Sequence, residues 1–555
     1  MAQPNDREAV PGTDYLVDVD HNLGSRHARG GKSDVNLIPQ PTSSPRDPLT
    51  WSPYKKYYQL FLLALYACAF SFGENNLGAA WTTVSEDIGV TIQDMNAGSA
   101  LNYLLLGFGN IFWIPLAMKL GRRIVFLTTT CFCLASAVWT GYIHGLASWM
   151  LTSILNGVGT SAYQAVIQLS IFDMFFVHER GRGLSYYLFG QQLGSILGLI
   201  TGGTIADTLG WRWSQFITGI IEATVLVLLF LSFEETLFPR VLFSRPQLEP
   251  EYAQVEAGAV PITTGDGKSP QHIGKEDLTN TVSTEVGENL PILPERTMLQ
   301  RLELWTYYPQ DRTPYWTYFC RPLFLFAFPN IVIAGVIFAF GCTAGIVSFN
   351  TISEILTEPP YNWSTSATGL VFLAALVGNF VGWGTGVLAD FIVVRLARRN
   401  GGVKEPEMRL WTLCFSFLYA AVGYLLYGWG AQNGLNWFTI AFGVGCMIAH
   451  QVSACSVATA YAMDCFPGIS GEIVVVLAIC SSLINFTISE TTQPLINAVG
   501  YGWAFTFYCL CVIASTIMAI PLLVFGKSWR KRCGPRYYKF LSERGGPELG
   551  GAALH

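Results

Sequence analysis

Charged residues are scarce in this sequence. Lys, Arg, Asp and Glu make up 13% of its 555 residues, about half of the roughly 25% that is typical of soluble domains. Hydrophobic residues make up 51%, which excludes an ordinary water-soluble protein and places the chain in a lipid bilayer. The net charge of −5 comes mainly from polar tails and one long polar segment, so nucleic acid is not expected as a partner.

Motifs of several enzyme and pump classes are also missing. The sequence has no G-x-x-x-x-G-K-[ST] loop, so we expect an ion gradient rather than ATP as the energy source. It has no nucleophile elbow or zinc signature that would support a membrane enzyme. The 13 cysteines form no C-x-x-C pair and fall almost wholly in apolar runs, where we interpret them as small buried hydrophobic residues. We therefore expect no metal and no cofactor.

Twelve runs approach the length of about 20 apolar residues that a membrane helix needs. They lie at 57–80, 95–118, 124–143, 148–175, 184–206, 214–233, 323–349, 366–389, 409–430, 437–461, 471–490 and 503–526. The sequence thus predicts an all-α membrane protein with six-helix bundles at 57–233 and 323–526. A polar linker is then expected at 234–322, and polar tails at 1–56 and 527–555.

Lys and Arg are unevenly distributed over the connections between these helices. They cluster after the second, fourth and eighth helices and in the last tail, whereas the connections on the opposite side carry only Arg212. Because cytoplasmic loops retain Lys and Arg, both termini and the linker are expected to be cytoplasmic. The sequon Asn362-Trp-Ser364 then lies outside and is a candidate for glycosylation, the alternative being a sequon that occurs by chance.

The two halves share weak similarity in matching positions. "PLAMKLGRR" at 115–123, after the second helix, corresponds to "GVLADFIVVRLARR" at 386–399, after the eighth. "IADTLGWRW" at 205–213 corresponds to "INAVGYGW" at 496–503. Two matches in register with the helix count indicate a parallel-repeat transporter.

On these residues the chain resembles the major facilitator superfamily over nearly all of 50–530. The resemblance implies two pseudo-symmetric bundles, alternating access and a charged cytoplasmic gate built on a G-x-L-A-D-R-x-G-R-R loop. The second half keeps Asp390 of this pattern, whereas the first half has Ile114 and Met118 where glycine and aspartate are expected. We expect Asp390 to pair with a base such as Arg395 or Arg399, or with one in the other half. The other gate candidates are Arg122, Arg123, Asp173, Arg180 and Arg182. Asp173 lies just before the basic loop that contains Arg180 and Arg182, so we expect it in a structural gate salt bridge, the alternative being a role in coupling.

Further motifs resemble the fungal branch of the drug:proton antiporter-like families, especially the polyamine and histidinol type. They are "FFVHERGRGLS", "GWRWSQF", "EETLFPR", "RPLFLFAFP" and "EPEMRLW". The antiporter signature of the fifth helix appears as "GSILGLITGG" without its two prolines. Its glycines Gly194, Gly198 and Gly202 remain and predict a close helix approach. Ser153 stands where many relatives carry a proton-coupling arginine.

Polar residues inside the predicted helices are the candidates for transport, because they are costly in lipid and usually face a cavity. The candidates for substrate binding or coupling are Glu74, Asn75, Tyr163, Gln164, Gln168, Gln191, Glu222, His450 and Gln451. Each has an alternative role in interhelical hydrogen bonding or packing. For Glu222 the resemblance adds doubt, because the sixth helix of this fold belongs to the outer scaffold. The spans carry no deep Lys or Arg, so cationic or neutral polar substrates are favoured over anions.

Glu74 is the acid that most needs an explanation. In a helix over 57–80 it lies roughly 9 Å below the outer end at 1.5 Å per residue, too deep for bulk water. The resemblance places the first helix at the central cavity, so we interpret Glu74 as a proton-coupling or substrate-binding group. The alternative is a neutral Glu74 that holds the bundle together through a hydrogen bond.

The leading hypothesis is a proton-coupled secondary transporter that exports a metabolite, such as a secondary metabolite, or a xenobiotic. The first alternative is proton-driven uptake of polyamines or other organic cations, and the second is a membrane sensor that transports nothing. We expect a monomer, and the plasma membrane in preference to the vacuolar membrane.

Overall fold

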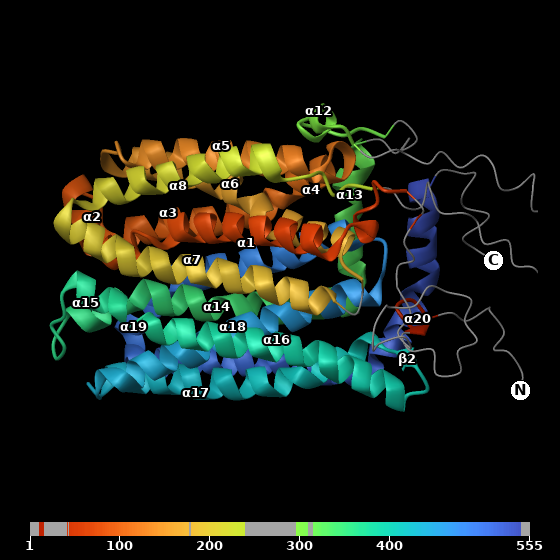
Figure 1. Ribbon diagram of the computed structural model, residues 1–555. Coiled ribbons are helices and arrows are strands. Elements are labelled where there is room, and N and C mark those ends of the chain that lie inside the picture. Colours follow the sequence, from red (N-terminus) through yellow and green to blue (C-terminus); the bar gives the residue numbers. More distant parts are fainter. Residues whose placement is uncertain are drawn as a thin grey trace, which may run out of the picture.

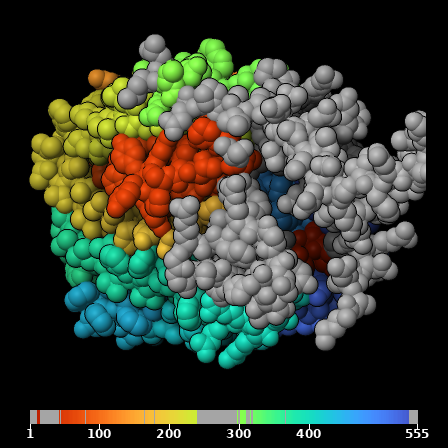
Figure 2. All heavy atoms as spheres, turned by 45° about the vertical axis from the view of Figure 1, so that its right-hand side comes forward, coloured from red at the N-terminus to blue at the C-terminus, as the bar shows by residue number. Residues whose placement is uncertain are grey.

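The computed structural model describes residues 10–15, 42, 44–176, 179–238, 296–308 and 315–545. Long helices run side by side in two bundles, one formed by each half of the chain (Figure 1). Figure 2 shows the first half of the chain meeting the second half along a seam. At this seam α3 packs on α19 and α7 packs on α16.

The first bundle consists of α1 (Pro53–Asn75), α3 (Ile92–Phe108) with α4 (Asn110–Leu120), α5 (Arg122–Thr140), α6 (Gly145–Met174), α7 (Arg180–Thr208) and α8 (Trp211–Ser232). The second consists of α14 (Pro329–Thr357), α15 (Thr365–Leu370) with α16 (Leu373–Arg399), η5 (Pro406–Thr412) with α17 (Leu413–Gln432), α18 (Trp437–Cys465) and α19 (Ser470–Ile517). The shorter or peripheral helices are η2 (Pro48–Thr50), η3 (Gly78–Ala80), α2 (Trp81–Ile88), α12 (Met298–Arg301), α13 (Tyr315–Phe324), η4 (Leu325–Ala327) and α20 (Ala519–Gly545).

The two ends of the bundle differ. At one end, called the α20 end below, α20 lies across the other helices (Figure 1). Near it the strands β1 (Asp14–Tyr15) and β2 (Val403–Lys404) pair in antiparallel fashion, which joins residues far apart in the sequence. At the opposite α2 end lie α2 and α15 (Figure 1). Asn362 adjoins α15, with a backbone φ of 50°, so the sequon lies at the end away from α20.

Hydropathy and the observed helices together give twelve crossings. Eight described helical segments are long and apolar enough to span a membrane, and α1, α6 and α7 are long helices outside that set because of their polar residues. The last apolar segment contains two crossings, since Gly500 interrupts α19 with φ 81° and ψ 167°. Large apolar side chains such as Ile220, Val377 and Leu510 remain exposed on the outside, as expected where helices face lipid tails.

Three helix boundaries differ from those predicted. α1 ends at Asn75 rather than near residue 80, so Glu74 lies in its last turn, followed by η3 and α2. The eleventh helix continues well past residue 490 to the break at Gly500. α13 begins inside the segment expected to be linker. Apolar content alone missed the extension past residue 490, because polar residues there remain helical when neighbouring helices supply their hydrogen bonds.

Candidate functional site

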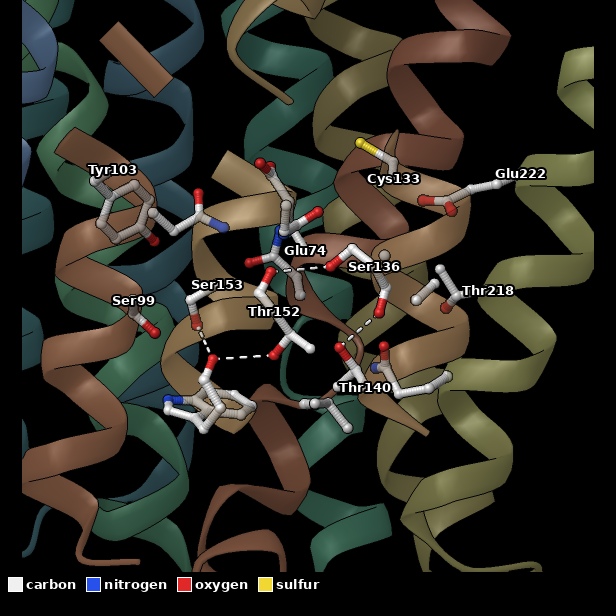
Figure 3. A pocket seen from close by; sticks show the side chains of 18 of the residues that line it. Glu74, Ser99, Tyr103, Cys133, Ser136, Thr140, Thr152, Ser153, Thr218 and Glu222 are labelled. Atoms are coloured by element: carbon white, nitrogen blue, oxygen red, sulfur yellow. Dashed lines mark hydrogen bonds between the residues drawn. The ribbon is translucent and has the colours of Figure 1, made fainter. Parts of the chain in front are cut away.

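A polar cavity of about 120 Å³ lies inside the first bundle, toward the α2 end. It is walled by α1, α2, α3, α5, α6 and α8 (Figure 3). Its polar lining residues are Glu74, Asn75, Ser99, Asn102, Tyr103, Ser136, Thr140, Thr152, Ser153, Asn156, Gln215, Thr218 and Glu222. Among the described residues that line it, none is Lys, Arg or His. The cavity has room for several water molecules but is small for an organic substrate.

Glu74 connects this cavity to the seam between the halves. The Tyr163 hydroxyl on α6 donates to Glu74 Oε2 at 3.4 Å, and Gln191 Nε2 on α7 donates to the Tyr163 oxygen at 2.8 Å. Gln191 is buried, and α7 packs against α16 of the other half. Three residues singled out in the sequence therefore form one hydrogen-bonded chain from α7 to α1.

Glu222 on α8 lines the same cavity as Glu74. Its side chain is only 3% exposed, and its Oε2 atom has no hydrogen-bond partner among the residues that the structure describes. Figure 3 shows its carboxylate and Glu74 among the cavity-lining side chains. A helix expected to be outer scaffold therefore carries a carboxylate into the interior, because α8 packs on α1 and α5 and turns this face inward.

Asn75 and its neighbour Asn76 hold α1 in place. Asn75 Nδ2 donates to the Ser71 carbonyl oxygen at 2.9 Å and to Ser195 Oγ on α7 at 3.2 Å. Asn76 donates to Thr218 Oγ1 on α8 at 2.5 Å and accepts from Gln215 Nε2 at 2.7 Å. These bonds fix the end of α1 beside Glu74.

The fifth-helix glycines face α1 within the same half. A Cβ atom on Gly198 would lie 2.6 Å from the Phe72 carbonyl oxygen, and a Cβ atom on Gly194 or Gly202 would overlap the α1 backbone at Cys68 or Asn76. This spacing of four residues along both helices explains why only glycine fits there. The glycines therefore bring α7 and α1 together, which confines Glu74 and Gln191 to the short distance that Tyr163 spans.

The remaining candidates lie away from this cavity. Gln168 donates to the Tyr187 hydroxyl at 3.0 Å, which joins α6 to α7. His450 Nδ1 lies 2.9 Å from Ser416 Oγ on α17, within the second half. Gln451 lies against Gly345 on α14. The side chain of Gln164 lies outside the described part of the structure.

Asp390 joins the halves at the α20 end. Its Oδ1 pairs with Arg409 Nη1 at 2.7 Å, and its Oδ2 accepts the backbone N–H of Arg182 at 2.7 Å. The two bases named from the sequence, Arg395 and Arg399, are not the partners seen here. Arg395 and Arg399 are exposed on α16, whereas Arg409 in η5 is buried beside Asp390.

Sequence reasoning missed the cluster behind this contact. Asp464 accepts from Lys404 Nζ at 2.8 Å and lies 3.5 Å from Arg409 Nε. All three side chains are about 3% exposed. The motif "EPEMRLW" contained Arg409, and Asp464 ends the apolar run of α18, but nothing local to either pointed to the other.

The corresponding end of the first half has a different arrangement. Arg122 Nε pairs with Asp173 Oδ2 at 3.1 Å, so Asp173 is in a salt bridge, as predicted, with a base in the gate loop. The Arg180 guanidinium lies over the Phe172 ring at 4.6 Å. Buried Glu235, in the motif "EETLFPR", accepts the backbone N–H groups of Arg122 and Arg123 at 2.9 and 3.0 Å, where the N-terminus of α5 favours a negative charge.

These features define a class of protein. Twelve membrane-length helices in two packed halves, with polar groups buried inside them, are the architecture of a multi-pass membrane transporter. The family model of the Major Facilitator Superfamily matches residues 63–488. The chain therefore belongs to the major facilitator superfamily, and its function is secondary transport of small molecules.

Relatives agree with this assignment. Protein HOL1 of Saccharomyces cerevisiae is 26% identical over 535 residues, which cover 90% of this chain and 91% of HOL1. "Probable efflux pump mfs2" of Aspergillus flavus is 26% identical over 443 residues, which cover 80% of this chain and 95% of the relative. The solved structure of the proton:xylose symporter XylE superposes with a TM-score of 0.57 at 13% identity, covering 85% of this chain and 97% of XylE, and shows the shared fold.

Proposed function

We propose that the protein is a proton-coupled transporter that exports small cationic or neutral polar organic molecules across the plasma membrane. The observation that carries this proposal is the chain Gln191–Tyr163–Glu74, which links the seam to a carboxylate at an interior cavity. A relative with "efflux pump" in its name supports export. The termini and linker are cytoplasmic in this proposal, so the α20 end faces the cytoplasm.

The hydrogen-bonded series Gln191–Tyr163–Glu74 suggests how transport of the substrate is coupled to movement of a proton. The halves of such a transporter rock against each other about the central site, and α7 lies at the seam. Movement of α7 changes the contact between Gln191 and the Tyr163 hydroxyl, which is also the donor to Glu74. A buried carboxylate that loses a donor is less stable in its charged form, so the rocking motion favours proton uptake in one state and release in the other.

A second candidate is uptake of organic cations, including polyamines. It is favoured by the scarcity of deep Lys and Arg in the predicted spans, which leaves little positive charge there to repel a cation. Export and uptake differ in the direction of flux relative to the proton gradient, and a sensor would give no flux.

Reconstituted liposomes test the proposal. With an imposed pH gradient, a panel of organic cations and neutral metabolites is offered from either side, and accumulation is measured by mass spectrometry. We expect Glu74→Gln to lose proton-driven accumulation but to retain exchange of substrate for substrate, because glutamine cannot release a proton. Glu86→Gln, an exposed acid on α2, is the matched control. Wild-type accumulation with unchanged pH dependence in Glu74→Gln contradicts the proposal.

A further inference from the structure

Two carboxylates face one interior cavity of the first half without a base beside them. Glu222 is buried with an unpartnered Oε2 atom, and Glu74 reaches the same cavity from α1. Two buried negative charges at one site repel each other and are poorly solvated. The two carboxylates are therefore stable beside each other only when the site also holds a positive charge.

The two acids are close because of a glycine. Gly73 precedes Glu74, and a Cβ atom on it would lie 3.3 Å from Glu222 Oε1 and 2.8 Å from a methyl carbon of Thr218. The Glu222 carboxylate thus rests against the α1 backbone one residue from Glu74. A larger residue at position 73 would push α8 away and separate the acids.

The other titratable side chains around the pair are weak acids. They are Tyr66 on α1, Tyr103 on α3, Cys133 on α5 and Tyr163 on α6, and among these described neighbours none is basic. Tyr163 donates a hydrogen bond to Glu74, and the Thr160 hydroxyl on α6 also bonds to this carboxyl group, while Tyr66 is engaged with Thr129 at 3.0 Å. The surroundings therefore supply hydroxyl and amide groups but no counter-charge.

We propose that Glu74 and Glu222 form one coupled cation site that holds a proton within the first half, separate from the route of the organic substrate. Glu222 is the inner member of the site at the α8 wall, and Glu74 passes its change of charge to the seam through Tyr163 and Gln191. The inference rests on the proposed proton coupling and names Glu222 as its second acceptor. A cavity of about 120 Å³ admits water and small cations to the pair but excludes most organic substrates.

Infrared spectroscopy tests the site without a substrate. The purified full-length protein in lipid nanodiscs is titrated with acid and base in sodium-free choline buffer, and the band of protonated carboxyl groups is followed. In Glu222→Gln we expect the Glu74 band to titrate at a pH lower by about one unit or more, because the neighbouring charge is gone. Glu74→Gln is expected to shift the Glu222 band in the same direction, and the double variant to lose both bands.

The outcomes are distinct. Midpoints that stay unchanged in both single variants mean independent acids and overturn the proposal, even where Glu74→Gln still abolishes accumulation. Loss of the band on replacing choline by sodium identifies a sodium site and overturns the assignment to a proton. Ser153→Lys, which puts a fixed cation into the cavity, is expected to reduce the band at neutral pH, with Ser153→Met as its uncharged control. An equal band in these two variants also overturns the proposal.

Discussion

Removing the charge of Asp390 is expected to open the α20 end. This carboxylate accepts the Arg182 N–H at the first turn of α7 and pairs with Arg409, so it bridges the two halves. A hydrogen bond to a charged group contributes about 1.5–3 kcal/mol, and a negative charge at a helix N-terminus adds about 0.3–1 kcal/mol. Asp390→Asn keeps the shape and one acceptor, so we expect it to destabilise the closed state by about 2 kcal/mol, which is roughly a 30-fold change in the closed-to-open ratio.

Hydrogen–deuterium exchange measures this change directly. The Arg182 amide is the donor in the bridge, so exchange over residues 180–185 should accelerate by about the same factor when opening is rapid and reversible. Glu179→Gln is the control, because Glu179 pairs with the Arg182 side chain at 3.6 Å with both groups about one-third exposed. Such surface pairs contribute under about 1 kcal/mol. Unchanged exchange in Asp390→Asn, or equal acceleration in both variants, refutes the reasoning.

Other predictions concern packing and topology. Gly198→Ala should destabilise the protein by about 1–3 kcal/mol, because the added Cβ atom overpacks against α1. Gly384→Ala is the control, because a Cβ atom there has nothing within 4 Å, and equal melting temperatures of the two variants contradict the prediction. Arg530→Gln should cost about 3–5 kcal/mol in thermal unfolding because it leaves a buried glutamate unpaired, whereas Lys527→Gln at an exposed side chain (56%) should cost under about 1 kcal/mol. A protease added outside intact cells should leave a tag in the linker 234–322 uncut, and cleavage there reverses the topology.

The Arg530 prediction rests on a contact between distant parts of the chain. Arg530 has no exposed surface, and its guanidinium donates to both Glu407 oxygens, at 2.9 and 2.7 Å. It also donates to the Pro11 carbonyl oxygen and to Thr13 Oγ1. The N-terminal segment 10–15 is thereby attached to the second half, which the sequence, with its polar and uniform tail, did not indicate.

Local physical chemistry in the sequence determined the membrane helices, and the resemblance of its motifs indicated the family. Apolar runs of sufficient length have few folded states other than membrane helices, and the matched motifs of the two halves indicated the repeat. The same reasoning identified Glu74, Tyr163 and Gln191 as polar residues that need partners inside a membrane. It did not show that the three bond to one another, because residue spacing fixes the face of a helix but not the helix that this face meets.

Only the tertiary structure decided which charges meet. Glu222 joins Glu74 because Gly73 lets α8 approach α1, and Asp390 meets Arg409 rather than Arg399 because η5 folds back onto the seam. Glu235 reaches the start of α5 from more than a hundred residues away. Each of these contacts depends on how the packed helices are rotated and spaced. Rotation and spacing are set by many weak packing contacts between residues that are distant in the sequence, so no short stretch of sequence specifies them.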